Sequence, residues 1–196
     1  FHFIEEPKKQ SLQPVVGLEL SFAVEETLSL KLYLLAQDTT GYKNLMKISS
    51  KQMSSDIQLD ELSDYLTGVA IVVPYFEELE TLSLPFDYYI GVDVNSPQKA
   101  YEKPIFPLYT VRYFETNEVE TLQMLHAIRD NISLKDAPPA SQGQNLLACD
   151  ILTQAFRETF PQALENQEKL ISNIHYEFDT DLKLPRFNRQ KPAQEE

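Results

Sequence analysis

Hydrophobic residues along the chain form short unbroken runs that alternate with segments of helical spacing. Five runs are apolar and rich in β-branched or aromatic residues, as buried strands are: 15–22, 28–36, 68–74, 87–94 and 105–111. Helical composition or spacing marks the segments 42–51, 59–66, 77–84 and 115–131, and later 146–160 and 161–175. Because apolar strands alternate with helices, we predict an α/β protein with parallel strands.

For some helices the sequence also predicts the cap, the apolar face or the position of a proline. Residues 39–42 offer a hydroxyl N-cap for the first long helix, whose apolar face follows the helical spacing of Tyr42, Leu45, Met46 and Ser49. The helix over 115–131 is the clearest, and one of its sides carries Val119, Leu122, Met124, Leu125 and Ile128. Pro161 is expected in the first turn of the last helix, whereas Pro7 limits 1–10 to a short or distorted helix.

A change of character near residue 135 divides the chain. Residues 1–134 form the α/β segment, 135–145 a loop, 146–187 a helical extension and 188–196 a linker. The sequence starts without an initiator Met in a stretch of helical composition, and it stops within the linker. We therefore expect a fragment of a longer protein.

Composition and charge narrow the class of protein. Of the 196 residues 42% are apolar, which suffices for one globular domain. The 17 basic and 30 acidic residues give a net charge of −13, and such a surface repels phosphate, so a free-standing nucleic-acid binder is disfavoured. Between Lys51 and Lys99 the chain has nine acidic residues and no basic one. Because no apolar run approaches the roughly 18 residues that cross a bilayer, and the N-terminus lacks the features of a signal peptide, we expect a cytoplasmic protein without a membrane partner.

Candidate reactive side chains are few. A single cysteine, Cys149, allows neither an internal disulfide nor a Cys-based zinc site, and buried packing on a helix is its expected role. The three histidines, His2, His126 and His175, lie far apart without the spacing of metal ligands. The five glycines form neither a phosphate-binding loop nor a nucleophile elbow. The usual signatures of nucleotide hydrolysis and of serine hydrolases are therefore missing.

Two features remain as candidate sites. Glu19 lies at the end of an apolar strand, which is where α/β sheets and barrels place active sites, although pairing with a base explains such a carboxylate equally well. Lys43, Lys47 and Lys51 recur every four residues and form a basic stripe that would contact phosphate or an acidic partner. A solvated helix face is the commoner explanation for such a stripe.

Several stretches, taken in order, resemble one family. They are Gln13-Pro14-Val15-Val16-Gly17-Leu18-Glu19, the segment 34–49 with its Leu-Ala-x-Asp-x-x-Gly-Tyr-x-Asn-Leu block, Val111-Arg112-Tyr113 followed by Leu125-His126-Ala127-Ile128-Arg129, and Ala163-Leu164-Glu165-Asn166. Together they resemble the PHP (polymerase and histidinol phosphatase) domain of bacterial DNA polymerase III alpha subunits. The resemblance covers nearly the whole chain, and Leu184-Pro185-Arg186-Phe187 resembles the exit towards the polymerase core.

The resemblance implies a fold and a metal site with specific departures. The fold would be a distorted (β/α)7 barrel, N-terminally incomplete in this chain, with a C-terminal helical appendage. In metal-binding members, strand ends carry H-x-H, further histidines, a glutamate and a late D-x-H, which hold a metal cluster for phosphoester hydrolysis. Here Glu19 matches the glutamate, but Thr110-Val111-Arg112 stands at the D-x-H position.

These departures predict a lost metal site. Thr and Arg do not replace a carboxylate and an imidazole as ligands, and a fixed cation about 4 Å from a divalent ion repels it by several kcal/mol at an effective dielectric near 20. We therefore predict no metal cofactor in this segment. Arg112 is instead expected to form a structural ion pair with Glu19 across the barrel mouth.

The function implied by the resemblance is that of a structural segment within a replicative polymerase. The longer chain would synthesise DNA on a DNA template with divalent metal held by carboxylates outside this segment. Its partners would be the polymerase core of the same chain and other replisome subunits, with DNA bound through the rest of the chain. Two alternatives stay open: a metal-dependent phosphoesterase or 3′-5′ exonuclease, which needs at least three converging ligands, and an α/β adaptor with an acidic docking surface.

Overall fold

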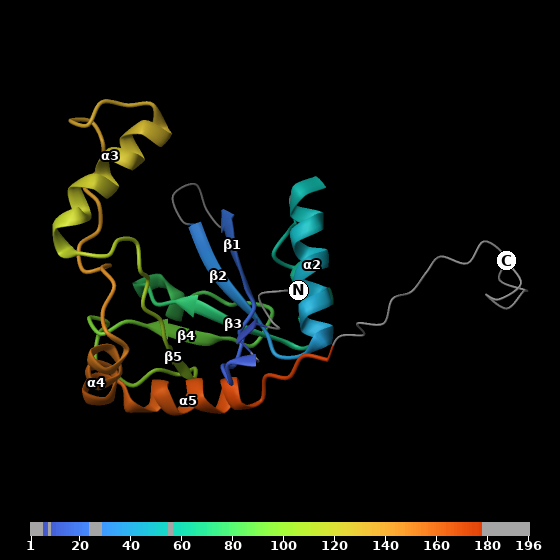
Figure 1. Ribbon diagram of the computed structural model, residues 1–196. Helices are drawn as coiled ribbons and strands as arrows, with labels where there is room; N and C mark the ends of the chain where they lie inside the picture. The colour runs from blue at the N-terminus through green and yellow to red at the C-terminus, as the bar shows by residue number, and fades with distance from the viewer. Residues whose placement is uncertain (1–5, 8, 24–28, 55–56, 178–196) are drawn as a thin grey trace, which may run out of the picture.

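The computed structural model describes residues 6–7, 9–23, 29–54 and 57–177 (Figure 1). In chain order its elements, with η for a 3-10 helix, are β1 (Gly17–Ala23), β2 (Ser29–Ala36), α2 (Thr39–Ser54), η1 (Glu61–Tyr65), β3 (Val69–Pro74), η2 (Glu77–Glu80), β4 (Tyr89–Val92), β5 (Ile105–Pro107), η3 (Thr116–Glu118), α3 (Val119–Asp130), α4 (Cys149–Thr159) and α5 (Pro161–Ser172). The mixed α/β class is confirmed. The predicted linker 188–196 lies outside the described residues.

The strands form one sheet in the order β1-β2-β3-β4-β5, and this sheet is mixed rather than parallel. The pairs β1–β2 and β2–β3 are antiparallel, whereas β3–β4 and β4–β5 are parallel. The prediction of parallel strands was therefore wrong for the first part of the sheet. Only five residues separate Ala23 from Ser29, and a parallel crossover needs a dozen or more. The described strands form this single five-stranded sheet, and closure into a (β/α)7 barrel stays a prediction.

Strand β1 lies at an edge of the sheet, which corrects the prediction of a strand buried on both faces. Leu20 is its one fully buried residue, Leu18 and Phe22 are half-buried, and the residues between them are exposed. This alternation with period two is typical of an antiparallel edge strand that has one face against the core. The apolar run Val15-Val16 before it lies outside the strand and is half-buried.

The core is built around β2 and β3. Leu30, Leu32, Leu34 and Ala36 of β2 have no exposed surface, and the neighbouring β3 buries four consecutive residues, 70–73. Helix α2 packs against β2 with Leu45 and Ile48, and α5 packs against β5. Figure 1 shows α2 on one side of the sheet and α4 with α5 along its lower side.

The start of α2 differs from the prediction. Its cap is Asp38, whose Oδ1 accepts a hydrogen bond from the Gly41 amide at 2.8 Å, while the Thr39 hydroxyl bonds to the backbone of Glu177 instead. A side chain at Gly41 would overlap the carbonyl of Gly68, so glycine permits this close approach of α2 to the turn before β3. Met46, expected on the apolar face, is 55% exposed, because the buried face runs through 41, 44, 45 and 48.

The remaining helices match the prediction in place but not always in extent. Pro161 occupies the first turn of α5, as predicted, and α5 ends at Ser172 rather than at His175. Segments 59–66 and 77–84 form only the short 3-10 helices η1 and η2. Cys149, expected to be buried, is exposed at the start of α4. Helix α3 confirms the predicted helix within 115–131. On its predicted apolar side Val119 and Leu122 are half-buried, whereas Met124, Leu125 and Ile128 are exposed.

The segment after α5 closes back onto the start of the sheet. The buried Tyr176 hydroxyl donates to the Ala36 carbonyl at 2.7 Å and accepts from the Val16 amide at 3.2 Å. The His175 amide donates to the Gln37 carbonyl at 2.9 Å, and His175 forms a β-bridge with Asp38. One tyrosine thereby joins the C-terminal segment to both β2 and the approach to β1.

We expect Tyr176→Phe to lower the free energy of unfolding by roughly 1–3 kcal/mol, because a carbonyl and an amide beside a buried ring both lose their partner. Urea denaturation of the protein measures the change. Tyr101→Phe is the matched control, since the Tyr101 hydroxyl bonds to the Pro97 carbonyl in an exposed setting. Equal losses for the two variants would contradict the role assigned to Tyr176.

Candidate functional site

A cavity of about 610 Å³ lies at the carboxyl ends of the parallel strands. We call it the sheet-end pocket. Its wall is formed by Lys31, Tyr33, Pro74, Tyr75, Gly91, 93–96, 108–110, Arg112, 141–145 and Leu147. Pro74 and Gly91 lie in the last part of β3 and β4, residues 93–96 and 108–110 follow β4 and β5 directly, and later segments of the chain add Arg112, 141–145 and Leu147. Strand β2 adds Lys31 and Tyr33 because it runs antiparallel to β3. Ligands of α/β sheets bind at this end of the strands.

The charged groups on the pocket wall are Lys31, Arg112 and Asp93. Glu19 joins them from the neighbouring strand, because its carboxylate forms an ion pair with Lys31 at 2.9 Å. Glu19 faces Tyr33 in the register of β1 and β2, so Lys31 is its diagonal neighbour two residues along the strand. Both side chains are partly exposed, at 47% for Glu19 and 35% for Lys31, so solvent screens the pair.

Glu19 and Arg112 act on each other without direct contact. The Lys31 ammonium is the main cause that lowers the pKa of the Glu19 carboxyl, burial opposes it, and the more distant charge of Arg112 contributes less. Within the described residues the ion pair of Glu19 is with Lys31 and none forms with Arg112. The structure therefore brings Glu19, Thr110 and Arg112 to one region, but Lys31 takes the partner position predicted for Arg112.

Arg112 is held by the segment 141–147, which crosses beside it. The Arg112 amide donates to the Gln144 carbonyl at 2.8 Å, and the Leu146 amide donates to the Tyr113 carbonyl at 2.9 Å. The Tyr109 hydroxyl bonds to the carbonyls of Gly143 and Asn145, at 3.1 and 2.7 Å. One wall of the pocket is thus formed by the end of the predicted loop 135–145 and by the first residues of the predicted helical extension 146–187.

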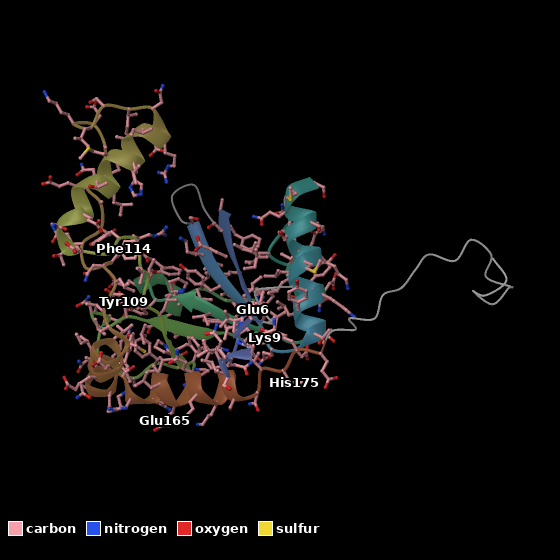
Figure 2. The ribbon with its side chains drawn as sticks, in the orientation of Figure 1. Glu6, Lys9, Tyr109, Phe114, Glu165 and His175 are labelled. Atoms are coloured by element: carbon pink, nitrogen blue, oxygen red, sulfur yellow. The ribbon has the colours of Figure 1, made fainter. Side chains whose placement is uncertain are left out.

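Tyr109 and Asp93 are pocket residues that the sequence reasoning missed. Burial raises the pKa of the Tyr109 phenol, which keeps it a neutral hydrogen-bond donor, and Figure 2 shows Tyr109 and Phe114 on the side from which α3 rises. Asp93 follows β4 directly, so the strand-end argument applied to Glu19 would have found it. Its carboxylate accepts hydrogen bonds from the Asn95 amide at 2.7 Å and the Ser96 hydroxyl at 3.4 Å.

The pocket residues do not fit the metal cluster of hydrolytic proteins with D-x-H and H-x-H ligands. Across residues 6–7, 9–23, 29–54 and 57–177, no three His, Cys, Asp or Glu side chains gather in a way that could hold a metal ion. At the pocket itself, the Asp93 carboxylate is engaged in a turn and the Glu19 carboxylate is paired with Lys31. The wall presents two cations and several neutral donors instead.

The lysine stripe on α2 does not belong to the pocket. Lys43 and Lys47 are exposed, and the Lys47 ammonium donates to the Asn44 side chain at 3.3 Å. Lys51 is paired with Glu61 at 2.9 Å and lies 5.8 Å from the centre of the Tyr65 ring. Two of the three lysines thus have local partners on α2 and η1, and their contact with phosphate or an acidic partner stays a prediction.

None of the helices in the described part of the chain is both long enough and apolar enough to span a bilayer. The sequence matches the PHP domain family over residues 1–116. It is 46% identical to the DNA polymerase III subunit alpha of Streptococcus pyogenes serotype M3 over 198 aligned residues, which cover 100% of this chain and 19% of that protein.

More distant relatives bear the same name. DNA polymerase III subunit alpha of Halalkalibacterium halodurans is 23% identical over 94% of this chain and 20% of its own length. That of Rickettsia bellii is 32% identical over 35% of this chain and 6% of its own length. The chain therefore spans about a fifth, 19%, of the streptococcal relative and a similar or smaller share of the others.

We expect Lys31→Gln to raise the pKa of Glu19 towards its ordinary value of 4.5, because the main cause of the lowering is removed. A pKa lower in the folded than in the unfolded chain stabilises the fold above pH 4.5, and this contribution is lost as the pH falls through the folded pKa. The stability difference between the parent protein and Lys31→Gln should therefore shrink in acid. Carboxyl NMR titration of Glu19 measures the pKa directly.

Arg112→Gln is the control for that titration, and it should raise the pKa of Glu19 by less than Lys31→Gln does. If Arg112→Gln has the larger effect, then Glu19 pairs with Arg112 in solution and the assignment to Lys31 fails.

Proposed function

This chain belongs to the PHP domain family, and we propose that it is the PHP segment of a replicative DNA polymerase III alpha subunit in the bacterial cytoplasm. The longer chain synthesises DNA on a DNA template, and this segment contributes architecture rather than chemistry. Divalent metal for nucleotide transfer is held by carboxylates elsewhere in that chain. The support is the similarity to streptococcal DNA polymerase III subunit alpha, which extends over the whole of this chain.

The observation that carries the structural role is the charge of the sheet-end pocket. In metal-binding PHP proteins, this end of the strands holds carboxylates and imidazoles. Here Lys31 and Arg112 line the pocket, and Lys31 has taken the carboxylate of Glu19 as its partner. Each cation raises the free energy of a divalent ion at this position, and the two carboxylates that would offset it, Glu19 and Asp93, are engaged with Lys31 and with a turn. The ion pair of Glu19 and Lys31 also joins β1 to β2. We infer a degenerate metal site, which no longer binds metal and whose residues now support the fold.

The alternative of a metal-dependent phosphoesterase or 3′-5′ exonuclease requires at least three converging ligands. The acidic groups nearest the pocket are Glu19 and Asp93, and both already have partners. The polymerase segment is therefore the better-supported function. The second alternative, an acidic adaptor, gains no support from the pocket, since its wall is polar and carries both signs of charge.

The test uses the full-length chain, purified without chelator. We expect it to extend a primed template when deoxynucleotides are supplied, and to retain no stoichiometric zinc, manganese or iron by elemental analysis. In added manganese without deoxynucleotides, the primer should keep its length. These results follow because the polymerase metals bind elsewhere and the pocket offers a divalent ion two cations and no three converging ligands among the described residues.

Two results would overturn parts of this proposal. Failure of the full-length chain to extend any primer would remove the polymerase assignment. Retained metal, together with manganese-dependent shortening of the primer that is lost in Glu19→Gln, would establish the exonuclease instead.

A further inference from the structure

Helix α3 presents an apolar face to solvent. Met124, Leu125 and Ile128 lie at helical positions i, i+1 and i+4, so they share one face, and they are 44%, 57% and 74% exposed. Ile132, just beyond the helix, continues the apolar character with 42% exposure. Figure 1 shows α3 standing away from the sheet, whereas α2 and α5 lie along it. We call Met124, Leu125 and Ile128 the α3 face.

The opposite side of α3 is already covered by its own chain. The Ile132 amide donates to the Ala127 carbonyl at 3.0 Å as the chain leaves the helix, and the Gln123 side chain donates to the Ala137 carbonyl at 3.2 Å. Ala127 and Ala137 are both buried there. The chain that follows α3, up to Ala137, therefore packs against this inner side of the helix, and the α3 face points away from it. Neighbouring apolar residues of this kind on an exposed helix mark an interaction site.

The position of α3 relative to the family match indicates which partner to expect. The match to the PHP domain family ends at residue 116, and α3 begins at Val119. Similarity to the streptococcal polymerase subunit continues through α3 to the end of the chain. Helix α3 thus lies outside the part of the chain that matches the PHP family, but inside the part that aligns with the streptococcal polymerase subunit. This chain covers 19% of the length of that subunit. A contact needed within the polymerase accounts for this distribution.

The charges beside the α3 face select a basic partner. Glu115 and Glu118 form the capping box before the helix, and Glu120 follows in its first turn. Arg129 is neutralised by Asp130, with two hydrogen bonds of 2.7 and 2.8 Å. The rim is therefore acidic, and a second copy of this chain would bring like charges together. A polymerase needs basic residues to bind the phosphates of DNA. Because this chain has a net charge of −13, we expect those residues in the rest of the polymerase.

We propose that the α3 face docks into an apolar groove with a basic rim in the remaining four fifths of the same polymerase chain. The proposal rests on the proposed function, since it requires that longer chain. It names the element through which this segment joins the rest of the molecule. An amphipathic helix in such a groove buries anchors at i, i+1 and i+4, as Met124, Leu125 and Ile128 would be.

The first experiment is photo-crosslinking within the full-length chain. A photo-reactive phenylalanine analogue replaces Ile128, and mass spectrometry identifies the crosslinked peptide. We expect a peptide of the same chain outside residues 1–196, apolar and flanked by Lys or Arg. The same analogue at Ile151 is the control, since Ile151 of α4 is 57% exposed, and it should give no crosslink to that peptide.

A second measurement uses trypsin cleavage after Arg129, within α3, in the full-length chain. Leu125→Glu should speed this cleavage because a charge cannot enter an apolar groove, so the docked helix is released. Ile151→Glu is the matched control, since both parent side chains are 57% exposed, and its cleavage rate after Arg129 should stay that of the parent.

Three results would overturn the docking proposal while the polymerase assignment stands, provided the parent chain extends primers. They are a crosslink to position 128 of a second copy, a crosslink to a different protein, or equal cleavage rates for Leu125→Glu and Ile151→Glu. A parent chain that extends no primer overturns the proposed function itself, so the two failures are told apart.

Discussion

The alternation of side chains along β2 is the constraint on which the rest of the structure depends. Leu30, Leu32, Leu34 and Ala36 have no exposed surface, and they hold the strand between β1 and β3. Because successive residues of a strand point to opposite faces, burying this set fixes Lys31 and Tyr33 on the other face. That face forms a wall of the sheet-end pocket. A shift of one residue would bury Lys31 and expose the leucines.

Segments distant in the sequence form hydrogen bonds that hold β2 and the pocket wall in place. Tyr176 reaches across from the C-terminal segment to Ala36 and Val16, and Gln144 binds the amide of Arg112. Each of these contacts satisfies a backbone group that would otherwise be buried without a partner or left to water. The pocket is therefore assembled from five regions of the chain, and the backbone of one of its cations, Arg112, is positioned by a hydrogen bond to Gln144.

The pocket and α3 suit different roles in the segment. The pocket carries the cations Lys31 and Arg112, and Lys31 is paired with Glu19, which suits the supporting role that we propose. Helix α3 lies beyond the family match and keeps an apolar face uncovered, which suits attachment to a larger body.

The sequence by itself determined the mixed α/β class and the place of the strands and the long helices, since these depend on local periodicity. It did not determine that β1 and β2 are antiparallel, that Lys31 rather than Arg112 takes the carboxylate of Glu19, or that the α3 face is exposed. The reason is physical: periodicity tells which residues share a face, but what lies opposite that face depends on contacts such as Tyr176 with Ala36, made 140 residues apart. Only the tertiary structure brings those partners together.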